Sequence, residues 1–197
     1  MVLYCCVYDV ITRKLPKQTT HKFSAERERL LRIMDEDQID RASPEFFSTD
    51  IQTATEYTLR ERARADELLK IIEQIKTPSK QNIGLDGSRA AWLIALHNYD
   101  YKNLGLVVLK KMRRLYYKDK NTVFYPGIPF LVDRIMISKQ STIDPDNLPL
   151  QLYGTQGIVM RSKDRTISKQ FPIIDSQNLI KRRNKFGLGV QSSCTHH

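Results

Sequence analysis

The sequence predicts a mainly α-helical protein, a single domain of about five helices with a small C-terminal β-hairpin. Several segments repeat apolar residues at the spacing of one helix face. Hydrophobic residues make up 41% and charged residues 27% of the 197 residues, close to globular averages, which argues against wholesale disorder. This length is enough for one domain with extensions. We expect an N-terminal extension over residues 1–22, a helix-rich domain over 23–188 and a disordered tail over 189–197.

The N-terminal part contains two predicted helices. Residues 1–11 are apolar and form either a short strand or an extension outside the fold, and residues 12–22 are a polar linker. A first helix is predicted over 24–41, ended near Pro44. A second follows over about 51–76, with a face of mixed charge that is typical of a solvated surface. The residues of this charged face are Arg60, Glu61, Arg62, Arg64, Asp66 and Glu67.

The middle of the chain predicts the core. Residues 79–87 are expected to connect two helices, with Asp86 or Ser88 as the cap of a third helix over 88–98. This helix is apolar nearly all round, which indicates a central, buried helix with Trp92 in the core.

The C-terminal part changes character along its length. A fourth helix over about 102–118 and a fifth over 130–138 are followed by a loop with two prolines. Residues 152–161 and 166–174 then predict the β-hairpin. A basic helix is expected over about 176–186, stopped by a glycine.

Several function classes are excluded by the sequence. No apolar run approaches the roughly 18 residues that span a bilayer, and the N-terminus lacks the basic start of a signal peptide. Cys5, Cys6 and Cys194 do not make a disulfide framework. We therefore expect a soluble, cytoplasmic protein without a membrane partner. The sequence contains no phosphate loop, cofactor motif or metal-ligand spacing, so it assigns no cofactor, metal, reaction class or oligomeric state.

Short motifs follow one another in an order that resembles one protein family. They are M-D-E-D-Q at residues 34–38 with Arg41, residues 84–97, Asp133 with Arg134, Y-G-T-Q at 153–156, P-I-I-D at 172–175 and R-R with G-L within 182–188. Over about residues 24–188 this order is similar to an uncharacterised, mainly bacterial family, domain of unknown function six-six-two-four. The chain departs from it at Leu96, where members usually carry Gln, at an insertion over 141–150, and at Leu152, where Arg is common. The resemblance implies no activity.

Polar residues within otherwise apolar segments are the candidate functional residues, because a buried polar group without a partner costs about 1–3 kcal/mol. We expect them to converge on a polar ligand-binding or catalytic cleft around His97 and residues 153–156. The candidate catalytic residues are His97, Asp37, Gln38 and Asp133. The candidate ligand-binding residues are Arg41, Arg134, Tyr153, Thr155 and Gln156. In a structural alternative these groups pair with one another, for instance Asp133 with Arg41, or Gln156 with a helix end.

His97 closes the apolar helix, and Asp100 follows three residues later. The pattern predicts a general base oriented by a carboxylate, a metal ligand together with Asp100, or a cap of the helix carbonyls. The hydroxyls and amide of residues 153–156 suit a polar uncharged group or a phosphate, and Gly154 allows a strained turn. The same segment alternatively forms a strand edge. The expected ligand is small and polar or phosphorylated, and whether the domain is an enzyme stays open.

Positive charge is concentrated in two segments. Residues 102–120 carry seven Lys and Arg against Asp119, and residues 161–186 carry eight against two acids, which together exceed the net charge of +10. A localised basic surface is typical of a polyanion partner, so a nucleic-acid or polyanion-binding module using these segments is the alternative function. Solvated helix faces are the other explanation of the charge. The third alternative is a protein-interaction domain whose polar residues are structural.

Overall fold

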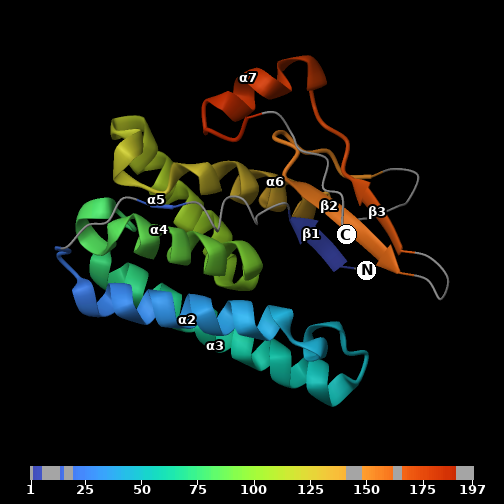
Figure 1. The fold of residues 1–197 in the computed structure, drawn as a ribbon, viewed down its shortest axis with the longest axis horizontal. Helices are drawn as coiled ribbons and strands as arrows, with labels where there is room; N and C mark the ends of the chain where they lie inside the picture. Colours follow the sequence, from blue (N-terminus) through green and yellow to red (C-terminus); the bar gives the residue numbers. More distant parts are fainter. Residues whose placement is uncertain (1, 6–13, 16–19, 141–147, 162–165, 190–197) are drawn as a thin grey trace. The chain divides into compact units, whose positions relative to one another are not determined.

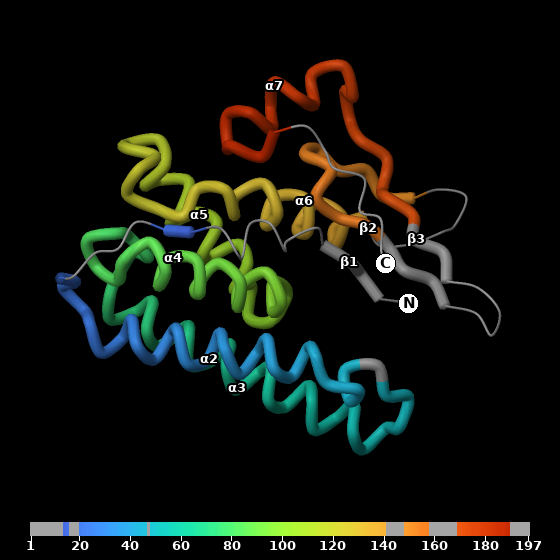
Figure 2. The backbone as a smooth tube through the Cα atoms, viewed as in Figure 1, coloured from blue at the N-terminus to red at the C-terminus, as the bar shows by residue number. Residues whose placement is uncertain are grey.

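The computed structural model describes residues 2–5, 14–15, 20–140, 148–161 and 166–189 (Figures 1 and 2). These residues form six α-helices and one small antiparallel sheet, which confirms the mainly α prediction. The sequence predicts one domain over 23–188, and the contacts divide the chain into two compact units. The helical unit is Leu15–Tyr125, and the mixed unit is Met1–Lys14 with Pro126–His197. No helix of the described part is long and apolar enough to cross a bilayer.

The helical unit is built around one central helix. Its helices are α2 (Ser24–Ala42), α3 (Ile51–Ile75), α4 (Lys80–His97) and α5 (Leu104–Lys118), with 3-10 turns η1 (Pro44–Phe47), η2 (Tyr101–Asn103) and η3 (Lys120–Thr122). Helix α4 contacts α2, α3 and α5, while α2 and α3 run side by side (Figure 1). Residues 90–96 of α4 are fully buried, and the Trp92 ring packs on Phe124, so the predicted central helix is confirmed.

The start of α4 corrects the predicted loop over residues 79–87. Ser79 caps a first helical turn by accepting the Asn82 N–H, and Gly84 then interrupts the helix at φ 73° and ψ 169°. A side chain at residue 84 would adopt this positive φ only with strain, and its Cβ would lie 2.5 Å from Asp86 Oδ1. Asp86 accepts the Gly87 N–H, whereas Ser88 accepts the distant Phe124 N–H and is not a cap.

The charged face of α3 is also different from the solvated face that the sequence predicts. Arg64 is buried and, with Arg60, pairs with Asp40 of α2. Glu67 likewise pairs with Arg29. These charges pair with residues of α2 because α2 packs along α3, whereas Arg62 of the same predicted face is exposed.

The mixed unit combines two helices with a three-stranded sheet. Helix α6 is Ile128–Ser138, the 3-10 turn η5 is Ser176–Asn178 and helix α7 is Leu179–Asn184. Another 3-10 turn, η4 (Tyr125–Gly127), contains the position in the chain at which the two units divide. Strands β1 (Val2–Cys5), β2 (Gln156–Arg161) and β3 (Thr166–Gln170) pair antiparallel in the order β1-β2-β3.

The sheet confirms the hairpin and extends it by one strand. Val2 is opposite Val159, and Gly157 is opposite Gln170. Of the two alternatives for the apolar N-terminus, the strand is therefore correct. The final helix is shorter than predicted because its first residues form the 3-10 turn. Most of the linker, the hairpin turn, residues 141–147 and the predicted tail from residue 190, with Cys194, lie outside the described residues.

Candidate acid–base site

The candidate residues fall into two groups, one in each unit. The group in the helical unit consists of Asp37, Gln38, Arg41 and His97. The group in the mixed unit consists of Asp133, Arg134, Tyr153, Thr155 and Gln156. Each group has its own hydrogen-bond network, and the two networks use different chemistry.

Asp37 and His97 form a close pair in the helical unit. Asp37 follows Leu30 and Ile33 on the buried face of α2 and is fully buried. His97 is the last residue of α4, so its imidazole lies where the buried helix ends. The His97 Nδ1 atom is 2.7 Å from Asp37 Oδ2. The carboxylate that contacts His97 is therefore Asp37, whereas the sequence suggested Asp100, the acid that follows three residues later.

Charge and hydrogen bonds keep Asp37 ionised despite its burial. Burial raises the pKa of Asp37, but the facing His97, Arg41 and Gln38 lower it more strongly, to about 2. Gln38 Nε2 donates to Oδ2 at 2.8 Å, and Arg41 Nε lies 3.3 Å from Oδ1. Each donor is positioned by α2 itself, one residue and one helical turn beyond Asp37.

His97 Nδ1 has two close neighbours, the Asp37 carboxylate and the Arg41 guanidinium. Arg41 Nε is 2.7 Å from the same Nδ1 that faces Asp37. One ring nitrogen cannot accept from Arg41 and donate to Asp37 at the same time. Either Nδ1 accepts from Arg41 Nε and the ring proton is on Nε2, or Nδ1 donates to the ionised Asp37 and Arg41 Nε donates to the other carboxylate oxygen. In the second arrangement, Nε2 is the basic nitrogen of the neutral ring.

Two residues of α3 complete the network. Arg41 Nη2 forms an ion pair with Glu61, and the Tyr57 hydroxyl donates to Glu61 Oε1 at 3.0 Å. Burial raises the pKa of Glu61 against the opposing effect of Arg41, and burial also raises the pKa of Tyr57. Sequence reasoning missed both residues because nothing in the spacing of α3 distinguishes a carboxylate that faces α2 from one that faces water.

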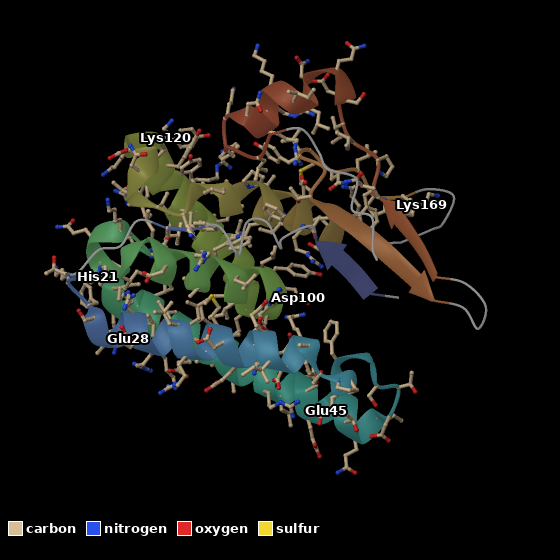
Figure 3. All side chains as sticks on the ribbon, in the orientation of Figure 1. His21, Glu28, Glu45, Asp100, Lys120 and Lys169 are labelled. Atoms are coloured by element: carbon tan, nitrogen blue, oxygen red, sulfur yellow. The ribbon has the colours of Figure 1, made fainter. Side chains whose placement is uncertain are left out.

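A cavity of about 390 Å³ adjoins this network within the helical unit. Its walls come from α3, the end of α4 and η2, and Asp100 lies close to the end of α4 (Figure 3). The lining residues are Thr58, Glu61, Arg62, His97, Asn98, Asp100, Tyr101 and Lys102. Both His97 and Glu61 thus belong to the ionised network and to the cavity wall. The volume is in the range of small-molecule sites.

The cavity wall also offers groups that a polar ligand can contact. The Arg62 guanidinium lies over the Tyr101 ring at 5.8 Å from the ring centre, and Lys102 pairs with Asp66 at 2.7 Å. Hydroxyl and amide groups come from Thr58, Tyr101 and Asn98. The metal alternative for His97 lacks a ligand set, because the described residues contain no group of three His, Cys, Asp or Glu side chains that could hold an ion.

In the mixed unit, Asp133 organises a loop. Asp133 is fully buried in α6 and accepts the N–H groups of Leu152, Tyr153 and Thr155 at 2.8–3.0 Å. The Thr155 hydroxyl donates to it as well, at 2.8 Å. Gly154 has φ 67°, the strained turn that the sequence predicts, which lets the chain wrap round the carboxylate. Burial raises the pKa of Asp133, against the effect of these neutral donors.

The remaining partners of this loop are also structural. Gln156 Nε2 donates to Thr155 Oγ1 at 3.2 Å and to the Phe130 carbonyl at 3.4 Å. Arg183 donates to the Tyr153 carbonyl at 2.8 Å, and Arg182 to the Leu152 carbonyl at 3.1 Å. These contacts agree with the structural alternative for residues 153–156. The pairing of Asp133 with Arg41 that this alternative suggested is replaced by loop amides for Asp133, and by Asp37 and Glu61 for Arg41.

Comparisons with protein-family models, curated proteins and solved structures find no match to the chain. The functional assignment therefore depends on the geometry of the two networks. Of these, the network at the end of α4 combines an ionised carboxylate, an oriented imidazole and a cavity.

Proposed function

We propose that the helical unit binds a small polar ligand in the cavity at the end of α4, and that His97 exchanges a proton with this ligand. Asp37 is the positioning residue that holds the imidazole with Nε2 basic. The observation that carries the proposal is the 2.7 Å contact between His97 Nδ1 and a fully buried Asp37, made by an imidazole that also lines the cavity. Glu61 lines the same cavity as a second ionisable group.

The charge balance of the network supports a role in proton transfer. With His97 neutral and both acids ionised, Asp37 and Glu61 carry two negative charges against the one positive charge of Arg41. A proton taken up by His97 neutralises the network without moving a side chain. An imidazole that gains a proton during a reaction is stabilised by a neighbouring carboxylate in this way.

The proposal is tested with the activated ester 4-nitrophenyl acetate as a probe of a basic imidazole. We expect the full-length H97Q variant to lose at least about tenfold in the catalysed rate, because general-base catalysis contributes about 100-fold or more. D37N should lose less and change the pH dependence of the rate, since Asp37 acts through His97. H21Q is the matched control, because His21 is the other histidine of the described residues and lies outside the cavity.

The alternative is that His97 only caps α4 and stabilises the fold. A structural imidazole should cost about 1–3 kcal/mol of unfolding free energy when it is replaced. A group kept for function is often neutral to the fold or destabilises it. An H97Q variant with the wild-type esterase rate and a large loss of stability in urea unfolding would contradict the proposal.

A further inference from the structure

One face of α5 carries basic and aromatic side chains that point to solvent. Lys110, Arg113, Arg114, Tyr117 and Lys118 are spaced at the intervals of a single helix face, and all five are exposed. The Tyr117 side chain is 73% exposed. We call these five residues the basic stripe. The opposite face of α5 is buried in the helical unit, through Leu104, Val108, Leu109 and Met112.

The positive charges of the stripe are not used within the described part of the fold. None of the ion pairs between described residues involves Lys110, Arg113, Arg114 or Lys118. Neighbouring basic residues outside the stripe behave differently: Lys111 donates to the Lys76 carbonyl, and Lys102 pairs with Asp66. A cation in the last turn complements the helix dipole, but only Lys118 occupies that position.

Aromatic and basic groups are in contact on the stripe. The Arg113 guanidinium lies 5.8 Å from the centre of the Tyr117 ring. The Tyr117 ring also meets Tyr116 edge-on at 5.6 Å, and Tyr116 in turn packs on Tyr125. The exposed Tyr117 ring is therefore in contact with a second aromatic ring and with a guanidinium, which makes it an aromatic platform beside positive charge.

We propose that the basic stripe binds single-stranded nucleic acid, with phosphates on its Lys and Arg side chains and a base stacked on Tyr117. This combination of a basic track and an aromatic platform is how proteins hold unpaired strands. The stripe covers about 12 Å along the helix axis, enough for a few nucleotides of a longer strand. The inference is independent of the cavity beside His97 and would stand if that proposal failed.

The structure favours a nucleic acid over a membrane surface as the partner. A helix that lies in a bilayer interface inserts its apolar face among the lipids. The apolar face of α5 is already buried within the helical unit, so the helix has no free apolar face to insert into lipid.

The second basic segment of the sequence, residues 161–186, offers less free positive charge to a nucleic acid than its composition suggests. Its Arg182 and Arg183 donate to backbone carbonyls of the mixed unit.

The test is fluorescence anisotropy of the full chain with a fluorescein-labelled 20-mer of deoxythymidine at 50 and 200 mM salt. We expect wild type to bind and R113A/R114A to bind at least tenfold more weakly. Because each phosphate contact contributes about 0.7 to the slope of log K against log salt for single strands, the double variant, which removes two cations, should flatten this slope by about 1.4. Y117A should weaken binding several-fold with little change in the slope, since stacking is not ionic.

A matched control distinguishes the effect of the basic stripe on binding from the effect of net charge. R32A/K70A removes two exposed positive charges elsewhere in the helical unit and should bind like wild type. All variants change exposed residues, and thermal unfolding checks that they fold. Absence of wild-type binding at 50 mM salt, or an equal loss in R32A/K70A and R113A/R114A, would overturn the proposal. Binding to phosphatidylserine vesicles with none to the oligonucleotide would overturn it in favour of a membrane partner.

Discussion

Asp37 and Asp133 are both fully buried aspartates on helices, yet their partners differ in kind. Asp37 faces His97, Arg41 and Gln38, and its pKa falls to about 2. Asp133 accepts hydrogen bonds from three backbone amides and one hydroxyl, and burial raises its pKa. Charged partners beside a cavity favour a role in proton transfer for Asp37. Hydrogen bonds from the amides of one loop favour a role in holding that loop for Asp133. An acid within an apolar helix is therefore the same signal in the sequence for two different roles.

The largest effect is expected from removing the structural carboxylate. The change D133A leaves the amides of Leu152, Tyr153 and Thr155 without their acceptor. We expect a loss of about 3–5 kcal/mol in unfolding free energy, measured by urea titration. D133N keeps one carbonyl oxygen and should lose clearly less. A loss below about 1 kcal/mol for D133A would mean that water replaces the carboxylate in this loop.

The next effect is a pH dependence that distinguishes the two acids. The pKa of Asp37 is lowered from 3.8 to about 2 in the folded protein. Its stabilisation is therefore present above pH 4 and lost as the pH falls through the folded pKa, and it amounts to about 2 kcal/mol. The difference in unfolding free energy between wild type and D37N should accordingly shrink between pH 5 and pH 3, by about half of that amount.

Asp133 should show the opposite sign in the same experiment. Its folded pKa is raised, so its contribution is present below the ordinary pKa and lost as the pH rises through the folded pKa. The stability difference between wild type and D133N should thus grow as the pH falls. If the stability differences of D37N and D133N from wild type changed with pH in the same direction, the contrast between the two aspartates would be wrong.

A smaller effect is expected at Thr155. Its hydroxyl donates to Asp133 and accepts from Gln156 Nε2. T155V keeps the shape and removes both bonds, so we expect a loss of about 1 kcal/mol in urea unfolding. T155S keeps the hydroxyl and is the control. If T155V loses no stability and T155S does, the methyl packing and not the hydrogen bonds stabilises this position.

The smallest effect is expected at Gln38, which is only half-buried. Q38M removes one donor to Asp37 but leaves His97 and Arg41 in place. We expect a loss of about 0.5 kcal/mol at pH 7 and a rise in the pKa of Asp37, because one group that favours the ionised form is gone. NMR titration of the Asp37 carboxyl measures the pKa, and an unchanged value would remove Gln38 from the candidate site.

The sequence indicated several residues of the candidate site but not the contacts between them. His97, Asp37, Gln38 and Arg41 were indicated by polar residues beside apolar ones, and they do meet. Glu61 was assigned to a solvated face, because a charged residue on an amphipathic helix has no local sign of a partner on another helix. The loop predicted over residues 79–87 has a different cause, because Gly84 interrupts a helix that already starts at Lys80.

The sequence by itself determined the helices and the buried position of α4. Both follow from apolar spacing and all-round apolarity, which are local properties of the chain. Only the tertiary structure decided which donor each buried acid meets. His97 and Asp37 are sixty positions apart, and Thr155 and Asp133 are twenty-two apart. Such contacts depend on how whole elements pack, and hydrogen bonds act only over about 3 Å, so no local pattern specifies them.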